Sequence, residues 1–153
     1  MTDVNDSLPS VIVTDSEGTQ MNLAEIKGAF VLYFYPKADT PGCTKEGQEF
    51  TALSDDFAKA GYKIYAISKD APAKLAKFAA KYGFTITLLS DETGDATEKM
   101  GVWIEKSMYG KVYMGIDRST FIVGSDGKVK HTWHKVKVAG HAAEVLATAQ
   151  KLG

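Results

Sequence analysis

The sequence predicts a single α/β domain in which helices flank a central mixed sheet, with a small β-hairpin at its N-terminus. Three observations predict this fold class. Strand patterns alternate with helical periodicity, residues 29–35 form a continuously apolar run typical of a strand buried on both faces, and a hairpin pattern appears late in the chain. No repeat, low-complexity tract or linker divides the 153 residues. We therefore expect one domain over residues 1–153, with residues 1–7 as a loose N-terminus.

The first elements are the N-terminal hairpin and the buried strand. Residues 11–14 and 20–23 flank residues 15–18, whose composition is that of a turn. The apolar strand at 29–35 follows and stops at Pro36.

A long helix is expected after the loop at residues 36–42. Phe50, Leu53 and Phe57 recur at i, i+3 and i+7, and Gly61 ends this helix. The later elements are a strand at 62–68, a helix at 73–82 that stops at Gly83, strands at 85–89 and 119–123, a turn at 124–127 into a strand at 128–133, and a helix at 141–152.

Composition and charge exclude several functional classes. The 18 basic and 19 acidic residues leave a net charge of −1, which gives no basic field for nucleic acid. The longest apolar run has seven residues, whereas a membrane span needs about 20. The acidic N-terminus lacks the basic and apolar regions of a secretory signal. We expect a cytoplasmic protein without nucleic-acid or membrane partners.

The chain contains one cysteine, Cys43, and one arginine, Arg118. A single cysteine excludes an intrachain disulfide and every multi-cysteine zinc or iron–sulfur site. No group of histidines and carboxylates has the spacing of a metal site. We therefore expect neither a metal nor a cofactor.

Cys43 is expected at the N-terminus of the long helix. Unpaired backbone N–H groups and the positive end of the helix dipole stabilise an anion there, and a thiolate is such an anion. Gly42 lets the backbone approach a substrate closely, and Thr40 offers a hydroxyl to the thiolate or to a substrate oxygen. Glu46 lies in the first helical turn and would oppose a thiolate, so we expect it to turn toward Arg118 or the backbone.

Cys43 and Arg118 also have ordinary structural interpretations. A lone cysteine is most often a small buried apolar residue, and a lone arginine most often forms a surface salt bridge. Two observations favour functional roles: Cys43 lies in a polar loop, and lysine occupies every other basic position. In the functional interpretation, Arg118 serves as a fixed, always charged, bidentate donor.

Spacing argues against other cysteine chemistries. A phosphatase loop needs an arginine six residues after the cysteine, where this chain has Glu49, and the second cysteine of a thioredoxin-type motif is replaced by Glu46. A cysteine hydrolase needs a histidine near the sulfur. We expect all three histidines, His131, His134 and His141, to be surface or cap residues.

At these residues the sequence resembles a peroxiredoxin of the bacterioferritin comigratory protein or Q-type subfamily (PrxQ). Pro36, Thr40 and Cys43 match the pattern Pro-x-x-x-Thr-x-x-Cys, and the resemblance runs from about residue 8 to the C-terminus. Further similar blocks occur in order at residues 89–91, 101–103, 105–106, 108–115, 118–121 and 134–138. The resemblance implies a thioredoxin-like fold and reduction of hydrogen peroxide or organic hydroperoxides at the expense of thiols.

The resemblance also implies a role for each site residue. Cys43 is the peroxidatic nucleophile, and its product is a sulfenic acid. Thr40 holds the peroxide and the thiolate by hydrogen bonds. Arg118 stabilises the thiolate and polarises the O–O bond, and Pro36 closes the pocket.

The chain departs from the subfamily at the resolving cysteine. The usual position, five residues after the first cysteine, holds Gln48, and the alternative place in the next helix holds Ala79 and Ala80. No intramolecular disulfide can form. We expect a one-cysteine cycle in which thioredoxin, glutaredoxin or glutathione reduces the sulfenic acid, while the helix stays wound.

Some questions stay open at this stage. A thioredoxin-like redox-sensing or chaperone module would form mixed disulfides at Cys43 without turnover, and a degenerate or engineered chain with Gln48 would trap one redox state. Phe34, Trp103 and Tyr109 are candidate pocket walls or core aromatics. A monomer is expected, because no exposed apolar stripe is obvious.

Overall fold

The computed structural model describes residues 2–152. The strands are β1 (Ile12–Asp15), β2 (Gln20–Asn22), β3 (Ala29–Phe34), β4 (Tyr62–Ser68), β5 (Thr87–Ser90), β6 (Trp103–Met108), β7 (Lys111–Ile116), β8 (Ser119–Val123) and β9 (Val129–Trp133). The helices are the 3-10 turn η1 (Leu23–Glu25), α1 (Pro41–Ala52), α2 (Ser54–Lys59), α3 (Pro72–Tyr82), α4 (Asp95–Lys99) and α5 (His141–Leu152). None of these helices is long and apolar enough to cross a bilayer.

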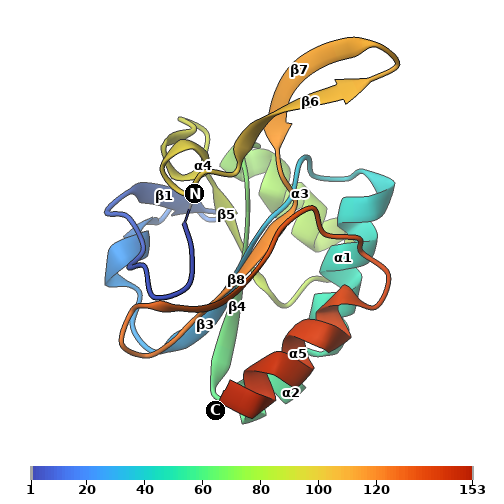
Figure 1. Ribbon diagram of the computed structural model, residues 1–153. Coiled ribbons are helices and arrows are strands. Elements are labelled where there is room, and N and C mark those ends of the chain that lie inside the picture. The colour runs from blue at the N-terminus through green and yellow to red at the C-terminus, as the bar shows by residue number, and fades with distance from the viewer. Residues whose placement is uncertain (1, 153) are drawn as a thin grey trace.

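A seven-stranded mixed sheet forms the centre of the molecule, in the order β2-β1-β5-β4-β3-β8-β9 (Figure 1). Strands β3, β4 and β5 are parallel, and the other neighbours in the sheet are antiparallel. Phe34, at the end of β3, pairs with Ser119, at the start of β8. The expected mixed sheet and N-terminal hairpin are confirmed.

Alternate residues of β3 supply the two layers of the core. Val31 and Tyr33 pack on the face covered by α1, α2, α3 and α5. Phe30, Leu32 and Phe34 pack on the opposite face, beneath the N-terminal segment and α4. Because β3 is buried on both faces, it reads as a continuous apolar run.

The expected long helix is two helices, so the prediction of one helix ending at Gly61 is wrong. The chain turns at Leu53 (φ −100°, ψ 3°), whose amide donates to the carbonyls of Glu49 and Phe50. The Ser54 hydroxyl donates to the Thr51 carbonyl at 2.8 Å, a local bond that competes with the helical ladder. Both helices pack on the same face of the sheet, so the apolar periodicity continues across the turn at Leu53.

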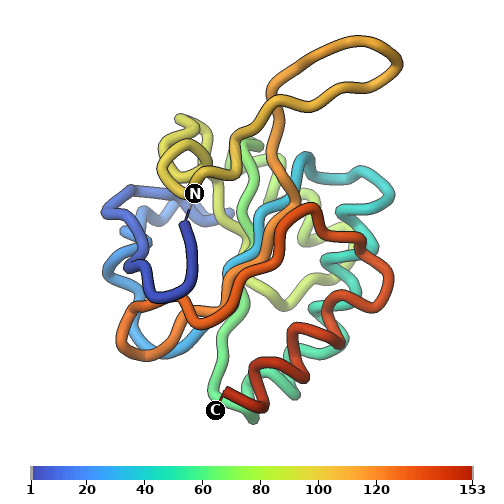
Figure 2. Tube along the Cα trace, viewed as in Figure 1, coloured from blue at the N-terminus to red at the C-terminus, as the bar shows by residue number. Residues whose placement is uncertain are grey.

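The hairpin of β6 and β7 and the short helix α4 were not predicted from the sequence. The hairpin extends away from the body of the molecule (Figures 1 and 2), so burial imposes no apolar pattern on most of its residues. Its exposed apolar side chains are Met108, Tyr109, Val112, Tyr113 and Met114. The expectation that the chain exposes no apolar stripe is therefore wrong.

The N-terminal segment is also more ordered than expected. The Thr2 amide donates to the Met100 carbonyl at 3.0 Å, and the Asn5 amide donates to the Val129 carbonyl at 2.8 Å. Ser7 forms a β-bridge with Lys128. Residues 2–7 are thus held along the sheet rather than loose, and Met1 lies outside the described residues.

Candidate active site

The first turn of α1 holds Cys43. Thr40 is the N-cap residue in extended conformation (φ −103°, ψ 155°), and Pro41 occupies the first helical position, where a missing N–H costs nothing. The first helical bond runs from the Thr44 amide to the Thr40 carbonyl at 2.8 Å. The amides of Gly42 and Cys43 therefore precede the helical ladder, as expected for an anion-stabilising helix start.

The thiol of Cys43 is 2% exposed and belongs to the core layer beneath α1. Phe50, two turns along α1, stacks on Tyr33 of β3 with ring centroids 4.6 Å apart. Sequence reasoning placed Cys43 in a polar loop and missed its burial, because the core layer that it joins also draws residues from β3 and α3.

Arg118, which immediately precedes β8, lies 75 positions from Cys43 in the sequence but reaches its sulfur in the fold. The pairing of Phe34 with Ser119 brings the residue before β8 beside the end of β3. Nη2 of Arg118 donates to Cys43 Sγ at 3.3 Å. A Cβ on Gly42 would lie 3.4 Å from the same Nη2, so the small residue leaves room for the guanidinium.

Glu46 turns toward Arg118, as the sequence predicted. Arg118 Nη1 donates to Glu46 Oε1 at 2.6 Å, while Glu46 Oε2 has no hydrogen-bond partner among residues 2–152. Glu46 is 1% exposed, and burial raises its pKa to about 7, although Arg118 lowers it. The guanidinium is thus shared between a carboxyl group and a sulfur.

The Thr40 hydroxyl does not contact the sulfur in the way we expected. It donates to the Lys37 carbonyl at 2.8 Å. Its oxygen keeps lone pairs that can accept a hydrogen bond from a peroxide. Pro36 lies exposed in the same loop.

Two aspartates, which sequence reasoning missed, anchor this loop through hydrogen bonds. Asp70, after β4, accepts bonds from the Ala38 amide at 2.7 Å and from the Ser68 hydroxyl at 2.9 Å. Asp39 adopts a positive φ of 61° and accepts a bond from the Tyr82 hydroxyl at 2.6 Å. No local sequence signal joins Ala38 to Asp70 or Asp39 to Tyr82, because these pairs are 32 and 43 positions apart.

Within residues 2–152, no histidine forms a hydrogen bond with the Cys43 sulfur. The expectation of a surface or cap residue is wrong for His141, which is buried between the rings of Phe50 and Trp133. Burial lowers its pKa to about 4, and Nε2 lies 2.8 Å from the Thr120 hydroxyl. His134 lies 3.1 Å from the Ser119 hydroxyl.

The three aromatic candidates have different positions. Phe34 is a core residue against Phe121, with ring centroids 6.0 Å apart. Trp103 is half-buried beneath the ammonium of Lys69, 3.9 Å from its ring centroid. Tyr109 is 98% exposed at the hairpin tip, so its expected role as a pocket wall or core aromatic is wrong.

The positions usually occupied by a resolving cysteine lie on intact helices. Gln48 is exposed on α1, and Ala79 and Ala80 lie in α3. Cys43 is a free thiol.

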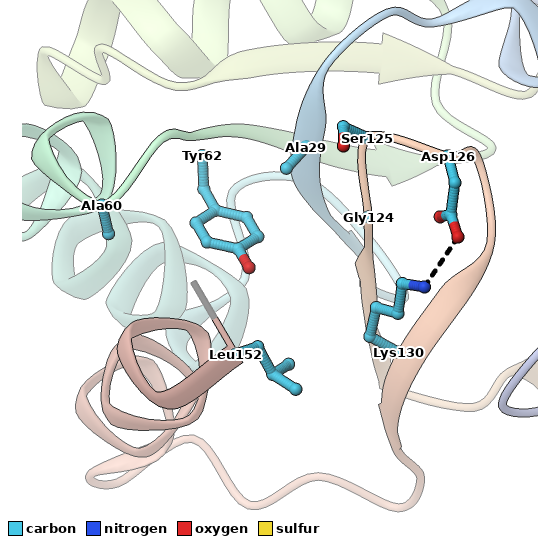
Figure 3. Close-up of a pocket in the computed structure, with 8 residues that line it drawn as sticks. All are labelled: Ala29, Ala60, Tyr62, Gly124, Ser125, Asp126, Lys130 and Leu152. Carbon is cyan, nitrogen blue, oxygen red and sulfur yellow. Dashed lines mark hydrogen bonds and ion pairs between the residues drawn. The ribbon is translucent and has the colours of Figure 1, made fainter.

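A hollow of about 420 Å³ lies away from Cys43, where β3 and β4 begin (Figure 3). Its lining residues are Ala29, Ala60, Tyr62, Gly124, Ser125, Asp126, Lys130 and Leu152. Asp126 and Lys130 form an ion pair at 2.8 Å, so their charges already have partners. Cys43 follows the opposite end of β3, so this hollow is separate from the cysteine.

Comparisons with known proteins reveal relatives along most of the chain. The profile of the AhpC/TSA family matches residues 4–132. The chain is 49% identical over 133 residues to peroxiredoxin Bcp of Xanthomonas campestris, covering 86% of this chain and 83% of that protein. It is 44% identical over 142 residues to peroxiredoxin Bcp of Escherichia coli K12, covering 92% and 91%.

A solved structure of one such relative also matches this chain closely. The bacterioferritin comigratory protein of X. campestris, solved in work on its alkyl peroxide reduction activity, matches with a TM-score of 0.90 and 43% identity. The match covers 98% of this chain and 99% of that chain. The predicted thioredoxin-like fold is confirmed.

Proposed function

The chain belongs to the AhpC/TSA family and is a peroxiredoxin, a thiol-dependent peroxidase, and from this premise we propose that Cys43 is its peroxidatic nucleophile. The observation that carries the proposal is the 3.3 Å bond from Arg118 Nη2 to Cys43 Sγ at the start of α1. A guanidinium and a helix start both stabilise a thiolate, and only the thiolate attacks a peroxide.

The reaction transfers charge from sulfur to oxygen. The Cys43 thiolate attacks the nearer peroxide oxygen, an S–O bond forms, and the O–O bond breaks. The departing hydroxide or alkoxide takes a proton and leaves as water or an alcohol, and Cys43 becomes a sulfenic acid. The fork of Arg118 and the Cys43 amide are fixed donors that can follow the charge as it moves.

The surrounding loop residues have supporting roles in this proposal. Thr40 positions the peroxide by accepting a hydrogen bond from it, while the Thr40 hydroxyl continues to donate to the Lys37 carbonyl. Gly42 admits Arg118 to the sulfur. Glu46 holds the other arm of the guanidinium, and Pro36 covers the mouth of the site.

The reducing half of the cycle uses an external thiol. Gln48 replaces the usual resolving cysteine and the chain has one cysteine in all, so another molecule must attack the sulfenic acid. We propose thioredoxin, glutaredoxin or glutathione as that reductant. We also propose that the enzyme acts as a monomer, on the resemblance to its subfamily alone, and in the cytoplasm, where such thiols are kept reduced.

Peroxide consumption with each reductant in turn tests the proposal. Cys43→Ser is expected to abolish turnover, and Arg118→Lys, which keeps the charge but loses the fork, is expected to slow Cys43 oxidation by about 10²-fold. Full activity in Cys43→Ser would end the proposal. Light scattering checks the monomer.

A further inference from the structure

The carboxyl group of Glu46 is buried with one of its two oxygens unpaired. The Glu46 side chain is 1% exposed. Its Oε1 accepts a hydrogen bond from Arg118 Nη1 at 2.6 Å, whereas its Oε2 has no hydrogen-bond partner among residues 2–152. Burying an unpaired charged oxygen costs far more than burying a neutral carboxyl group. The unpaired Oε2 therefore favours the protonated form of Glu46.

Glu46 and Cys43 share one cation. Nη2 of Arg118 donates to Cys43 Sγ at 3.3 Å, while Nη1 of the same guanidinium donates to Glu46 Oε1. Cys43 is 2% exposed, so water screens the charges of this cluster only weakly. Two anions on one guanidinium would leave an uncompensated buried charge. Arg118 therefore balances one anion, either the thiolate or the carboxylate, and not both.

The other charges that act on Glu46 do not relieve this competition. Among residues 2–152, Arg118 is the one cation in ion-pair contact with Glu46. Glu49, one turn further along α1, is a second carboxylate and repels the first. Burial raises the pKa of Glu46 to about 7, even though Arg118 lowers it. Glu46 can therefore change its protonation state close to neutral pH.

The neighbouring titratable side chains stay neutral in this pH range. Tyr33 and Tyr35 interact electrostatically with Glu46, and burial raises the pKa of both phenols. His141 of α5 packs against the Phe50 ring of α1, and burial lowers the pKa of His141 to about 4. None of these three groups gains or loses a proton near neutral pH, so they leave the competition for Arg118 to the thiolate and the carboxylate.

We propose that Glu46 holds a proton while Cys43 is a thiolate and releases it when Cys43 becomes a sulfenic acid. This inference rests on the proposed function, because it completes the same reaction. Oxidation removes the negative charge from the sulfur, and the positive charge of Arg118 then stabilises the Glu46 carboxylate instead. Glu46 acts through Arg118, as a positioning residue for charge and protons.

The proton balance of the peroxide step closes with Glu46. The Cys43 thiolate attacks the nearer oxygen, an S–O bond forms and the O–O bond breaks, so the sulfur is oxidised and the peroxide is reduced. The departing hydroxide takes up one proton to become water, and Glu46 releases one proton as the sulfur loses its charge. The step then draws no net proton from the solvent. When the external thiol returns Cys43 to a thiolate, Glu46 binds a proton again.

A proton count without peroxide tests the proposal. Methyl methanethiosulfonate converts the Cys43 thiolate, the only thiol in the chain, to a neutral methyl disulfide and releases methanesulfinate, which takes up no proton. At pH 8, about one unit above the pKa of Glu46, the wild type is expected to release about one proton per Cys43 into a weakly buffered indicator solution. Glu46→Gln keeps an oxygen for Arg118 but cannot ionise, and it is expected to release almost none.

Infrared difference spectra locate the released proton. The carbonyl stretching band of a protonated carboxyl group is expected to disappear when the wild type reacts, and Glu46→Gln is expected to show no such loss. Glu105→Gln makes the same change at an exposed carboxylate on β6, and it is expected to keep both wild-type signals. Equal proton release from the wild type and Glu46→Gln overturns the proposal. A band that persists in the wild type, or that is missing in Glu105→Gln, overturns it as well.

Oxidation by hydrogen peroxide repeats the count and separates this inference from the proposed function. Glu46→Gln is expected to take up about one proton more per oxidised Cys43 than the wild type does, and equal uptake by the two proteins contradicts the proposal. If peroxide fails to oxidise Cys43, the proposed function fails. The proton count with the thiosulfonate then still decides the role of Glu46.

Discussion

Replacing Glu46 with glutamine is expected to remove a pH-dependent destabilisation of the folded state, which comes from burying a carboxylate. The pKa of Glu46 rises from 4.5 to about 7, chiefly because burial disfavours the carboxylate. The folded protein therefore binds this proton more tightly than the unfolded chain does. Its free energy of unfolding falls as the pH rises from about 4.5 to about 7, and stays lower above that.

The size of this effect follows from the two pKa values. At a pH above both of them the charged carboxylate costs about 3 kcal/mol of stability relative to acid conditions. Glu46→Gln keeps an oxygen for Arg118 and cannot ionise. The stability of the variant relative to the wild type should rise by about 3 kcal/mol between pH 4.5 and 8.

Urea denaturation of both proteins across this pH range measures the difference. Glu105→Gln, which removes an exposed carboxylate on β6, controls for general charge effects. Parallel stability curves for the wild type and Glu46→Gln would refute the reasoning, since they would mean that Glu46 titrates alike in the folded and unfolded states.

Other predictions concern the residues around the sulfur. Gly42→Ala brings a methyl group 3.4 Å from Arg118 Nη2 and should slow Cys43 oxidation several-fold in stopped-flow measurements, with stability unchanged within about 1 kcal/mol; an unaffected rate would contradict the close fit. Phe50→Ala opens the aromatic layer and should lower the urea stability by about 3–5 kcal/mol. His141→Gln should abolish a loss of about 3 kcal/mol that the wild type shows as the pH drops from about 6.5 to about 4, because only the unfolded chain then protonates His141. Hydrogen exchange should show residues 43–48 equally protected before and after peroxide treatment, and lost protection would mean that α1 unwinds.

Local patterns predicted much of the sheet. The apolar run of β3 and the glycine stop of α3 are signals contained in a few consecutive residues, and both elements formed where expected. The turn at Leu53 was missed because the apolar spacing on either side of it stays in phase. The hairpin of β6 and β7 was missed because exposed strands carry no burial period.

The site was predicted in part. Cys43 and Arg118 stand out because each residue type occurs once, and Glu46 is a charged residue in the first helical turn. The burial of Cys43, the inward position of His141 and the Thr40 bond to Lys37 depend on packing between distant elements. No pattern within one segment reports such contacts.

The contact between Arg118 and Cys43 joins residues 75 positions apart. It requires the antiparallel pairing of β3 with β8, a long-range contact of the kind that forms slowly in folding. A chain that has made α1 but has not yet docked β8 holds a cysteine without its guanidinium. With Cys43 as the proposed peroxidatic residue, its rate of oxidation by peroxide is expected to act as a folding probe, which reports when β8 has docked beside β3.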